Sequence, residues 1–162
     1  MASPDARVLV LGTLPGPMSL AMRQYYAQPR NAFWPIMGAL FGAAPGSAYR
    51  SRLALLKRHR IALWDVCRSA RREGALDASI DAKSIVANDF VRFFESHRRI
   101  RLICFNGLTA GNLFGRLVLP GLPAPVQQIP RLTLPSTSPA HAAMRFERKL
   151  EAWTVVRRDS AV

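Results

Sequence analysis

Short apolar runs alternate with longer amphipathic stretches along the chain. Near-continuous apolar runs are typical of strands that are covered on both faces of a sheet. The last run is interrupted by Pro130, and this favours an edge strand or a bent strand because proline cannot donate a ladder hydrogen bond. The runs are Arg7–Leu11, Ile61–Val66, Arg101–Phe105 and Gln128–Leu134.

The amphipathic stretches between and after these runs predict helices. Asn31–Gly42 is apolar through three turns and ends on a glycine, which is favoured just after a helix. Pro139–Arg158 opens with a proline, which is tolerated in a first helical turn. Strands that alternate with helices favour a parallel sheet, so we expect a three-layer α/β/α sandwich in one domain, residues 1–162. The other predicted helices are Tyr49–Arg60, Ser84–Arg99 and Gly107–Leu119, and Pro120–Pro130 is predicted to be a proline-rich loop.

In a parallel sheet of this kind, ligands bind beyond the carboxyl ends of the strands. We therefore expect the segments that follow the predicted strands to converge on one crevice. These segments are Gly12–Gly16, Asp65–Ser69, Phe105–Gly107 and Leu134–Ala142.

The charge of the chain indicates a polyanionic partner. Lys and Arg number 23 against 10 Asp and Glu, a net charge of +13. Such a charge favours nucleic acid or an anionic membrane. Only Lys57, Lys83 and Lys149 are lysines, and arginine suits phosphate because its planar fork can bind two oxygens. A genome rich in G and C is the alternative explanation for the excess of arginine.

The remaining composition argues for a cytoplasmic protein. No apolar stretch is long enough to span a bilayer, and Met1–Arg7 lacks a signal-peptide pattern. Cys67 and Cys104 are expected to be small buried residues in a reducing compartment. Two thiols cannot hold an iron–sulfur cluster in the usual way, and the histidines are far apart, so no metal site is expected.

The first crevice segment has the sequence GTLPG. Gly12 and Gly16 allow a sharp turn and a close approach of the backbone to a ligand. An ordinary loop between a strand and a helix would contain the same residue types. The segment is not a P-loop, because GxxxxGK[ST] is absent.

Two aromatic residues and two amides are candidates for contact with a ligand, each with a structural alternative. Tyr25 and Tyr26 could stack on a base or form part of the core. Asn31 could cap the helix that follows it, or could hold a water or contact a base edge. Asn106 either satisfies loop backbone or points at the ligand.

Hydroxyl groups and one carboxylate complete the candidates. Ser136, Thr137 and Ser138 could contact phosphate, or could cap the start of a helix. Asp65 could stabilise a cation or orient other groups, but capping the next loop is the role we favour.

Taken together, these segments resemble a known family. LGTLPG, QYYAQPRNAFW, LWDVCRSARREGALDASI, FNG and LPSTSPAHA are similar to segments of the hypoxanthine-DNA glycosylases, family six of the uracil-DNA glycosylase superfamily. The similarity extends from Val8 to Trp153, and the mismatch-specific uracil-DNA glycosylases are related to this family. It implies a short four-stranded parallel sheet and a monomeric, nucleoid-associated enzyme of base excision repair. DNA with a damaged base would be its partner, and no cofactor would be needed.

The resemblance also implies roles for individual residues. Asn31 would position the attacking water, Tyr26 would stack on the flipped base, and Asn106 would contact the base edge. Gly12 and Leu14 would lie at the base, although Leu14 replaces the catalytic asparagine of related families. The loop that enters the minor groove would comprise Ser136, Thr137, Ser138, Pro139, Ala140 and His141.

Two positions depart from the family pattern. Gln28 stands where the family has histidine, and His141 stands where it has asparagine, so either change could alter substrate choice or weaken activity. The expected reaction is hydrolysis of the glycosidic bond of a flipped base, with Asn106 and backbone N–H groups stabilising the departing base. None of the crevice segments contains a lysine, so we predict a monofunctional glycosylase without a lyase step.

Three other functions remain open at this point. The enzyme could remove uracil from mismatches, although Leu14 argues against strong uracil activity. The chain could be a non-catalytic nucleic-acid-binding module on the same fold, with salt-sensitive binding and no base release. A Rossmann-type nucleotide enzyme is disfavoured because GxGxxG is absent and the charge would be unexplained.

Overall fold

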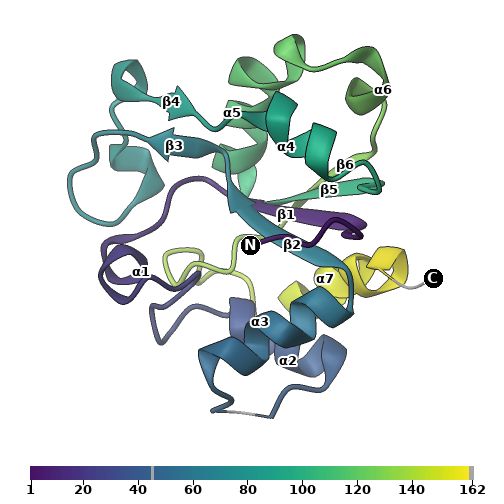
Figure 1. Cartoon of the computed structure of the whole chain (residues 1–162). Coiled ribbons are helices and arrows are strands. Elements are labelled where there is room, and N and C mark those ends of the chain that lie inside the picture. Colours follow the sequence, from purple (N-terminus) through teal and green to yellow (C-terminus); the bar gives the residue numbers. More distant parts are fainter. Residues whose placement is uncertain (45, 161–162) are drawn as a thin grey trace.

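The computed structural model describes residues 1–44 and 46–160. Within these residues, four parallel strands form the central sheet in the order β2–β1–β5–β6. The predicted strand runs are therefore confirmed, as is the parallel α/β architecture (Figure 1). The strands are β1 (Val8–Gly12), β2 (Ile61–Asp65), β5 (Leu102–Asn106) and β6 (Arg131–Leu134).

Helices cover both faces of the sheet (Figure 1). Side chains that alternate along β1 enter different cores: Val8 and Val10 pack with α2, α3 and α7, whereas Leu9 and Leu11 pack with α4 and α5. Burial on both faces explains why β1, β2 and β5 are apolar at nearly every position. The helices are α2 (Phe33–Phe41), α3 (Tyr49–Arg58), α4 (Phe90–Ser96), α5 (Leu108–Leu117) and α7 (Phe146–Ser160).

Strand β6 lies at an edge of the sheet, as Pro130 predicted. It pairs with β5 alone, and its first three residues are exposed. Pro130 lacks an N–H but still contributes to the pairing with β5, because its carbonyl accepts a hydrogen bond from the Ile103 N–H at 3.0 Å.

The predicted helix Ser84–Arg99 is wrong in its first half. Val86–Ala87 instead forms the short strand β4, which pairs with β3 (Cys67–Ser69) in an antiparallel hairpin. Asp89 ends the extended segment and caps α4, because its carboxylate accepts a hydrogen bond from the Arg92 N–H at 3.0 Å. Helix α4 therefore begins at Phe90, directly after the capping residue Asp89, and not at Ser84 as predicted.

The predicted start of the last helix at Pro139 is also wrong. Residues 139–145 form turns, in which the His141 N–H donates to the Ser138 carbonyl at 3.0 Å, and α7 begins at Phe146. The predicted loop Pro120–Pro130 contains a short helix, α6 (Ala124–Gln127). The remaining short elements are α1 (Pro17–Met22), η1 (Asp77–Ser79), η2 (Ala82–Ser84) and η3 (Leu119–Gly121).

The cysteines are as predicted, since Cys67 and Cys104 are buried and free. Among the described residues, no helix is both long enough and apolar enough to cross a bilayer. The described part of the chain also contains no group of three His, Cys, Asp or Glu side chains that could hold a metal ion.

Candidate active site

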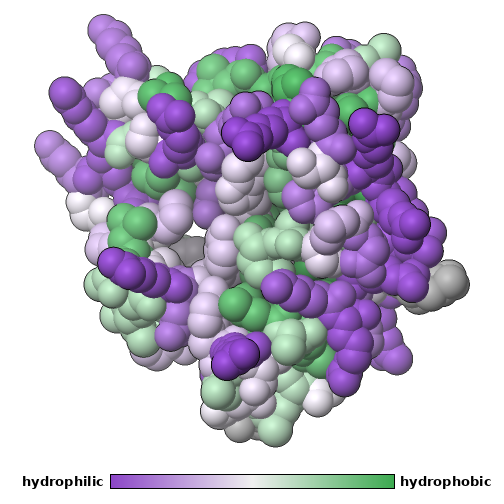
Figure 2. Space-filling model, viewed as in Figure 1, coloured by the Kyte–Doolittle hydropathy of each residue, from purple (hydrophilic) through white to green (hydrophobic). Residues whose placement is uncertain are grey.

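A cleft of about 1400 Å³ opens at the carboxyl ends of the strands. It lies between the α1 region and the β3–β4 hairpin, on the side where Figure 2 shows the surface hollowed. Residues from all four predicted segments line the cleft, although Asp65 is the only residue of the second segment that does so. The predicted site residues that line the cleft are Gly12, Leu14, Tyr26, Asn31, Asn106, Ser136, Ser138, Pro139, Ala140 and His141.

The floor of the cleft is formed where β1 and β2 end side by side. Gly12 and Asp65 are paired across the two parallel strands. A Cβ atom on Gly12 would lie 2.6 Å from the Asp65 Oδ1 atom and 3.4 Å from the Tyr26 hydroxyl. A larger residue at position 12 would have to displace the Asp65 carboxylate, so this close approach favours glycine.

Tyr26 forms one wall of the cleft. Its backbone has a φ of 53°, a left-handed conformation that is costly for a residue with a Cβ atom. The Tyr26 ring stacks on Phe33, with the ring centroids 4.0 Å apart. Phe33 is fully buried, so it supports one face of the tyrosine ring from the core. Tyr26 therefore packs on the core, as one alternative predicted, and it also lines the cleft, where stacking on a base stays a prediction.

Neighbouring contacts hold Tyr26 in this strained position. The Tyr25 N–H donates to the Tyr49 hydroxyl at 2.9 Å, and the Trp34 Nε1–H donates to the Tyr25 carbonyl at 2.8 Å. On the other side, the Ala27 N–H donates to the Ser19 hydroxyl at 3.2 Å. Contacts from three helices thus fix the segment before the ligand binds, which is a preorganised arrangement.

The Asn31 side chain contacts the start of α2 and also lines the cleft. Its Oδ1 atom accepts a hydrogen bond from the Phe33 N–H at 2.9 Å, which satisfies a free amide in the first turn of α2. This bond fixes the side chain, while a second lone pair on Oδ1 and the Nδ2 donors are left for a ligand. Asn31 lines the cleft, so a water bound there would face the ligand.

Asn106 is bonded at both ends of its amide to Thr137. Its Nδ2 donates to the Thr137 Oγ1, and its Oδ1 accepts from the Thr137 N–H, both at 2.8 Å. Thr137 is 1% exposed, and its carbonyl accepts a hydrogen bond from the Ala32 N–H at 2.9 Å. Thr137 therefore ties β5, the 135–141 loop and the start of α2 together, and its hydroxyl is turned away from any phosphate at the surface.

Helix α7 holds the 135–141 loop at two points. The Trp153 Nε1–H donates to the Pro135 carbonyl at 3.0 Å, and the Lys149 ammonium donates to the His141 carbonyl at 2.8 Å. Trp153 is fully buried and Lys149 is only 5% exposed, and burial lowers the pKa of that lysine. The loop is thus attached to the core at both of its ends.

Arg72 attaches the GTLPG loop to the segment that follows β3. Its guanidinium donates to the Pro15 carbonyl at 2.7 Å and lies 3.5 Å from the Asp77 carboxylate. The Arg72 side chain is 6% exposed, whereas the Asp77 side chain is 38% exposed, so only the guanidinium is shielded from water. The sequence did not single out this residue, because its carbonyl partners in the GTLPG loop lie 57 and 58 positions away along the chain.

The mouth of the cleft is apolar with basic residues beside it, and sequence reasoning missed both features. The exposed apolar residues there are Met18, Leu20, Leu76, Leu108 and Met144, of which Leu108 is 72% exposed. Arg23 and Arg30 also line the cleft. An apolar mouth flanked by arginines suits contact with stacked bases beside a phosphate backbone.

Asp65 does not cap the next loop, contrary to our sequence interpretation. Its carboxylate accepts no hydrogen bond from any described residue, although its backbone carbonyl accepts one from the Asn88 amide at 2.8 Å. The side chain is 8% exposed, and burial raises the pKa of Asp65 to about 7. Burial penalises the charged form, which explains the direction of this shift.

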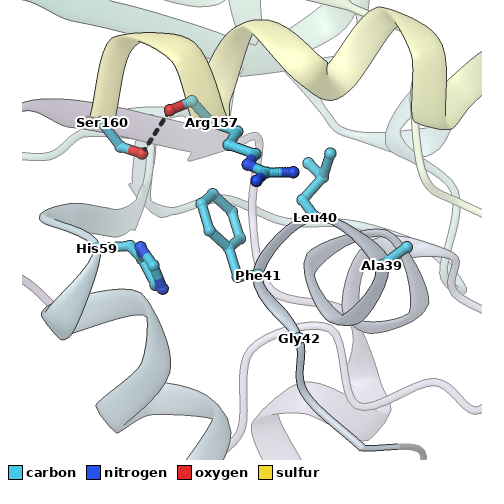
Figure 3. Close-up of a pocket in the computed structure, with 7 residues that line it drawn as sticks. All are labelled: Ala39, Leu40, Phe41, Gly42, His59, Arg157 and Ser160. Atoms are coloured by element: carbon cyan, nitrogen blue, oxygen red, sulfur yellow. Dashed lines mark hydrogen bonds between the residues drawn. The ribbon is translucent and has the colours of Figure 1, made fainter.

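A second hollow lies between α2, α3 and α7, away from the strand ends (Figure 3). The rings of His59 and Phe41 lie against each other there, with their centroids 4.6 Å apart, and the Ser160 hydroxyl donates to the Arg157 carbonyl. Burial and the nearby Arg58 and Arg157 lower the pKa of His59. No carboxylate of the described residues lines this hollow, whereas Asp65 and Asp77 line the main cleft.

Known proteins resemble the chain over most of its length. Two archaeal proteins named hypoxanthine DNA glycosylase match over 108 residues, which is 66% of this chain and 67% of each relative. The protein from Methanosarcina acetivorans is 42% identical over this region, and the protein from Methanosarcina barkeri is 38% identical.

A solved structure also resembles the chain over nearly its whole length. A solution NMR structure of a candidate uracil DNA glycosylase from Methanosarcina acetivorans superposes with a TM-score of 0.80 and 34% identity. The superposition covers 99% of this chain and 94% of that chain. A profile of the uracil DNA glycosylase superfamily matches residues 1–157. The chain therefore belongs to the uracil DNA glycosylase superfamily, the group of DNA glycosylases that its sequence segments resemble.

Proposed function

We propose that this DNA glycosylase releases a deaminated base, hypoxanthine first, by hydrolysing its glycosidic bond in DNA. The observation that carries the proposal is the placement of Tyr26, Asn31 and Asn106 around one cleft. The two relatives named hypoxanthine DNA glycosylase support the choice of base.

The walls of the cleft suit a base that has been turned out of the duplex. The Tyr26 ring is backed by Phe33 and offers its other face to a flat ligand. Stacking on an aromatic side chain stabilises a base by about 1–3 kcal/mol. This gain helps to offset the few kcal/mol needed to unstack and unpair the base.

Asn31 is the group proposed to hold the attacking water. An amide does not titrate in the useful range, so it would orient the water rather than take its proton. As the bond between sugar and base stretches, positive charge develops on the sugar and a water held by Asn31 can attack it. The hydrogen bond to the Phe33 N–H keeps the Asn31 side chain in one orientation during this step.

Asn106 is proposed to contact the base edge with the hydrogen-bonding capacity that its protein partners leave. Thr137 takes one N–H and one lone pair of the amide, and a side-chain hydrogen bond with Tyr26 takes one of the two remaining sites. Donors that face the departing base lower the energy of the charge that develops on it.

The reaction is proposed to end with base release, without cleavage of the DNA strand. A lyase step requires a lysine that reaches the sugar. Lys149 contacts the 135–141 loop, but its ammonium is buried against the His141 carbonyl behind that loop. It is also absent from the residues that line the cleft.

The proposal is tested with short duplexes that contain one hypoxanthine, uracil or xanthine. Base release is detected by strand cleavage in hot alkali, for the wild type and for Asn31→Ala. We expect release of hypoxanthine that falls by about 100-fold or more in Asn31→Ala, because positioning water contributes strongly to such steps. Circular dichroism of the variant controls for loss of fold.

Other outcomes would contradict parts of the proposal. Release of uracil alone would assign the chain to mismatch repair of uracil and would reject hypoxanthine as the preferred base. Salt-sensitive binding without release of any base would indicate a binding module, with Leu14 and Gln28 as the first residues to revert toward the family pattern. Strand cleavage without alkali would show a lyase step.

A further inference from the structure

Asp65 is the ionisable side chain at the floor of the cleft, and the proposed mechanism does not use it. Its Oδ1 atom lies 2.6 Å from the position that a Cβ atom on Gly12 would occupy. The neighbouring Asn106 and Thr137 satisfy each other, whereas the Asp65 carboxyl accepts no hydrogen bond from the described residues. A buried carboxyl without a partner is costly, so it is available for a group that a ligand brings.

The surroundings of Asp65 favour its protonated form. The Met1 ammonium favours its charged form, and Asp77 disfavours it. Tyr25 and Tyr26 face it as neutral phenols, because burial and the Asp65 charge raise the pKa of each. Cys67 is likewise a neutral thiol with a pKa raised to about 11. Burial outweighs these effects and raises the pKa of Asp65 to about 7.

A departing purine can accept a proton from such a group more readily than a departing uracil can, because it has basic ring nitrogens. When the glycosidic bond breaks, the base keeps the electron pair and becomes anionic. Uracil spreads this charge over two carbonyl oxygens, whereas hypoxanthine has one carbonyl oxygen and basic ring nitrogens. A carboxylate on the cleft floor would repel either anion, while a carboxylic acid could neutralise the purine.

We infer that Asp65 is the catalytic acid that donates a proton to a ring nitrogen of the departing purine. The bond between the sugar C1′ and N9 breaks, its electron pair stays with the base, and the Asp65 proton passes to the ring nitrogen. Water adds its oxygen to C1′ and releases a proton to solvent, from which Asp65 is reprotonated. The products are neutral hypoxanthine and an abasic site. This inference depends on the proposed glycosylase function.

The test is the pH dependence of single-turnover base release by the wild type and by Asp65→Asn. We expect wild-type release of hypoxanthine to fall as the pH rises above about 7, because the acid must be protonated. Asp65→Asn should be slower by about 100-fold or more at pH 6 and should show no such fall. Any release of uracil should change by only a few-fold in Asp65→Asn. Glu73→Gln removes an exposed carboxylate outside the cleft and serves as the matched control.

Each contrary outcome has a distinct meaning. Wild-type release that rises through pH 7 would overturn the inference, because it would show that the carboxylate form is active. A pH profile that is unchanged in Asp65→Asn would also overturn it. An inactive wild type on every duplex would instead reject the proposed function, and thermal unfolding of Asp65→Asn separates loss of fold from loss of the acid.

Discussion

At the scale of single residues, the cleft holds a carboxyl group whose ionisation opposes folding. Asp65 has a pKa of about 7 in the folded chain, against an ordinary value of 3.8. A raised pKa means that the protonated form is the one that the fold favours. The contribution of the protonated Asp65 side chain to the free energy of unfolding is complete below about pH 4. This contribution is lost as the pH rises through about 7.

We therefore predict that Asp65→Asn becomes more stable relative to the wild type as the pH rises. The amide cannot ionise, so the difference in unfolding free energy should grow by on the order of 3–4 kcal/mol between pH 4 and pH 8. Urea unfolding at several pH values measures it, with Glu73→Gln as the control. A constant difference across this range would mean that the Asp65 carboxyl is ionised in the folded chain without cost.

Sequence reasoning located these residues but not all of their partners. Gly12, Asn106 and Asp65 could be placed at one crevice because each ends a buried parallel strand, and the carboxyl ends of such strands share one edge. The sequence could not predict that the Asp65 carboxylate accepts no hydrogen bond from the described residues. The surroundings of this carboxylate depend on its contact with Gly12 on the neighbouring strand. The burial of Thr137 was missed for the same reason, because Asn106 lies 31 positions away.

At the scale of elements, helix α7 positions the 135–141 loop. Lys149 uses a buried ammonium to hold the His141 carbonyl, although burial of that charge is itself costly. Trp153 holds the other end of the loop at Pro135. Contacts of this kind fix the loop more than they stabilise the fold, because an apolar side chain could fill the same space.

We predict that Lys149→Met separates activity from stability. Methionine keeps the length of the side chain but cannot donate to His141, so the loop should loosen. Release of the target base should fall by about 10-fold, which is about 1.4 kcal/mol in the barrier. The Tm should stay the same or rise, because a buried charge is removed. Lys83→Met, at an exposed lysine, is the control. A large drop in Tm would assign Lys149 to the fold instead.

The elements that could be predicted from sequence are those whose pattern is local. The strands β1, β2 and β5 are continuous apolar runs, and α2 ends at Gly42, whose φ is 81°. The β3–β4 hairpin was missed because Val86–Ala87 is apolar and too short to show a period. Its pairing with Cys67–Ser69 is a long-range contact that no local pattern shows.

At the scale of the whole molecule, the positive charge is spread over more than the surroundings of the cleft. Arg23 and Arg30 line the cleft, whereas Arg98 and Arg99 precede β5 at the opposite end of the strands. Only arginines that meet the phosphate backbone release counterions when DNA binds. The net charge of +13 therefore overstates the number of phosphate contacts.

We predict that arginines near the cleft and far from it differ in their effect on the salt dependence of DNA binding. Arg23→Ala and Arg30→Ala should each reduce the slope of log affinity against log salt by about 1. Arg98→Ala and Arg99→Ala remove the same charge and should leave the slope unchanged. Fluorescence anisotropy with a labelled duplex at several salt concentrations measures this. Equal effects at all four positions would show that DNA contacts both ends of the molecule.

The close approach of Gly12 to Asp65 has a consequence for the divergence of related chains. Because any side chain at position 12 would meet the Asp65 carboxylate at 2.6 Å, position 12 cannot gain a side chain unless the carboxylate moves or is replaced. Lineages that acquire a larger residue after β1 should also carry a shorter one after β2. The two positions should thus covary, and a lineage that loses the carboxylate should also lose the preference for purines that we propose for this chain.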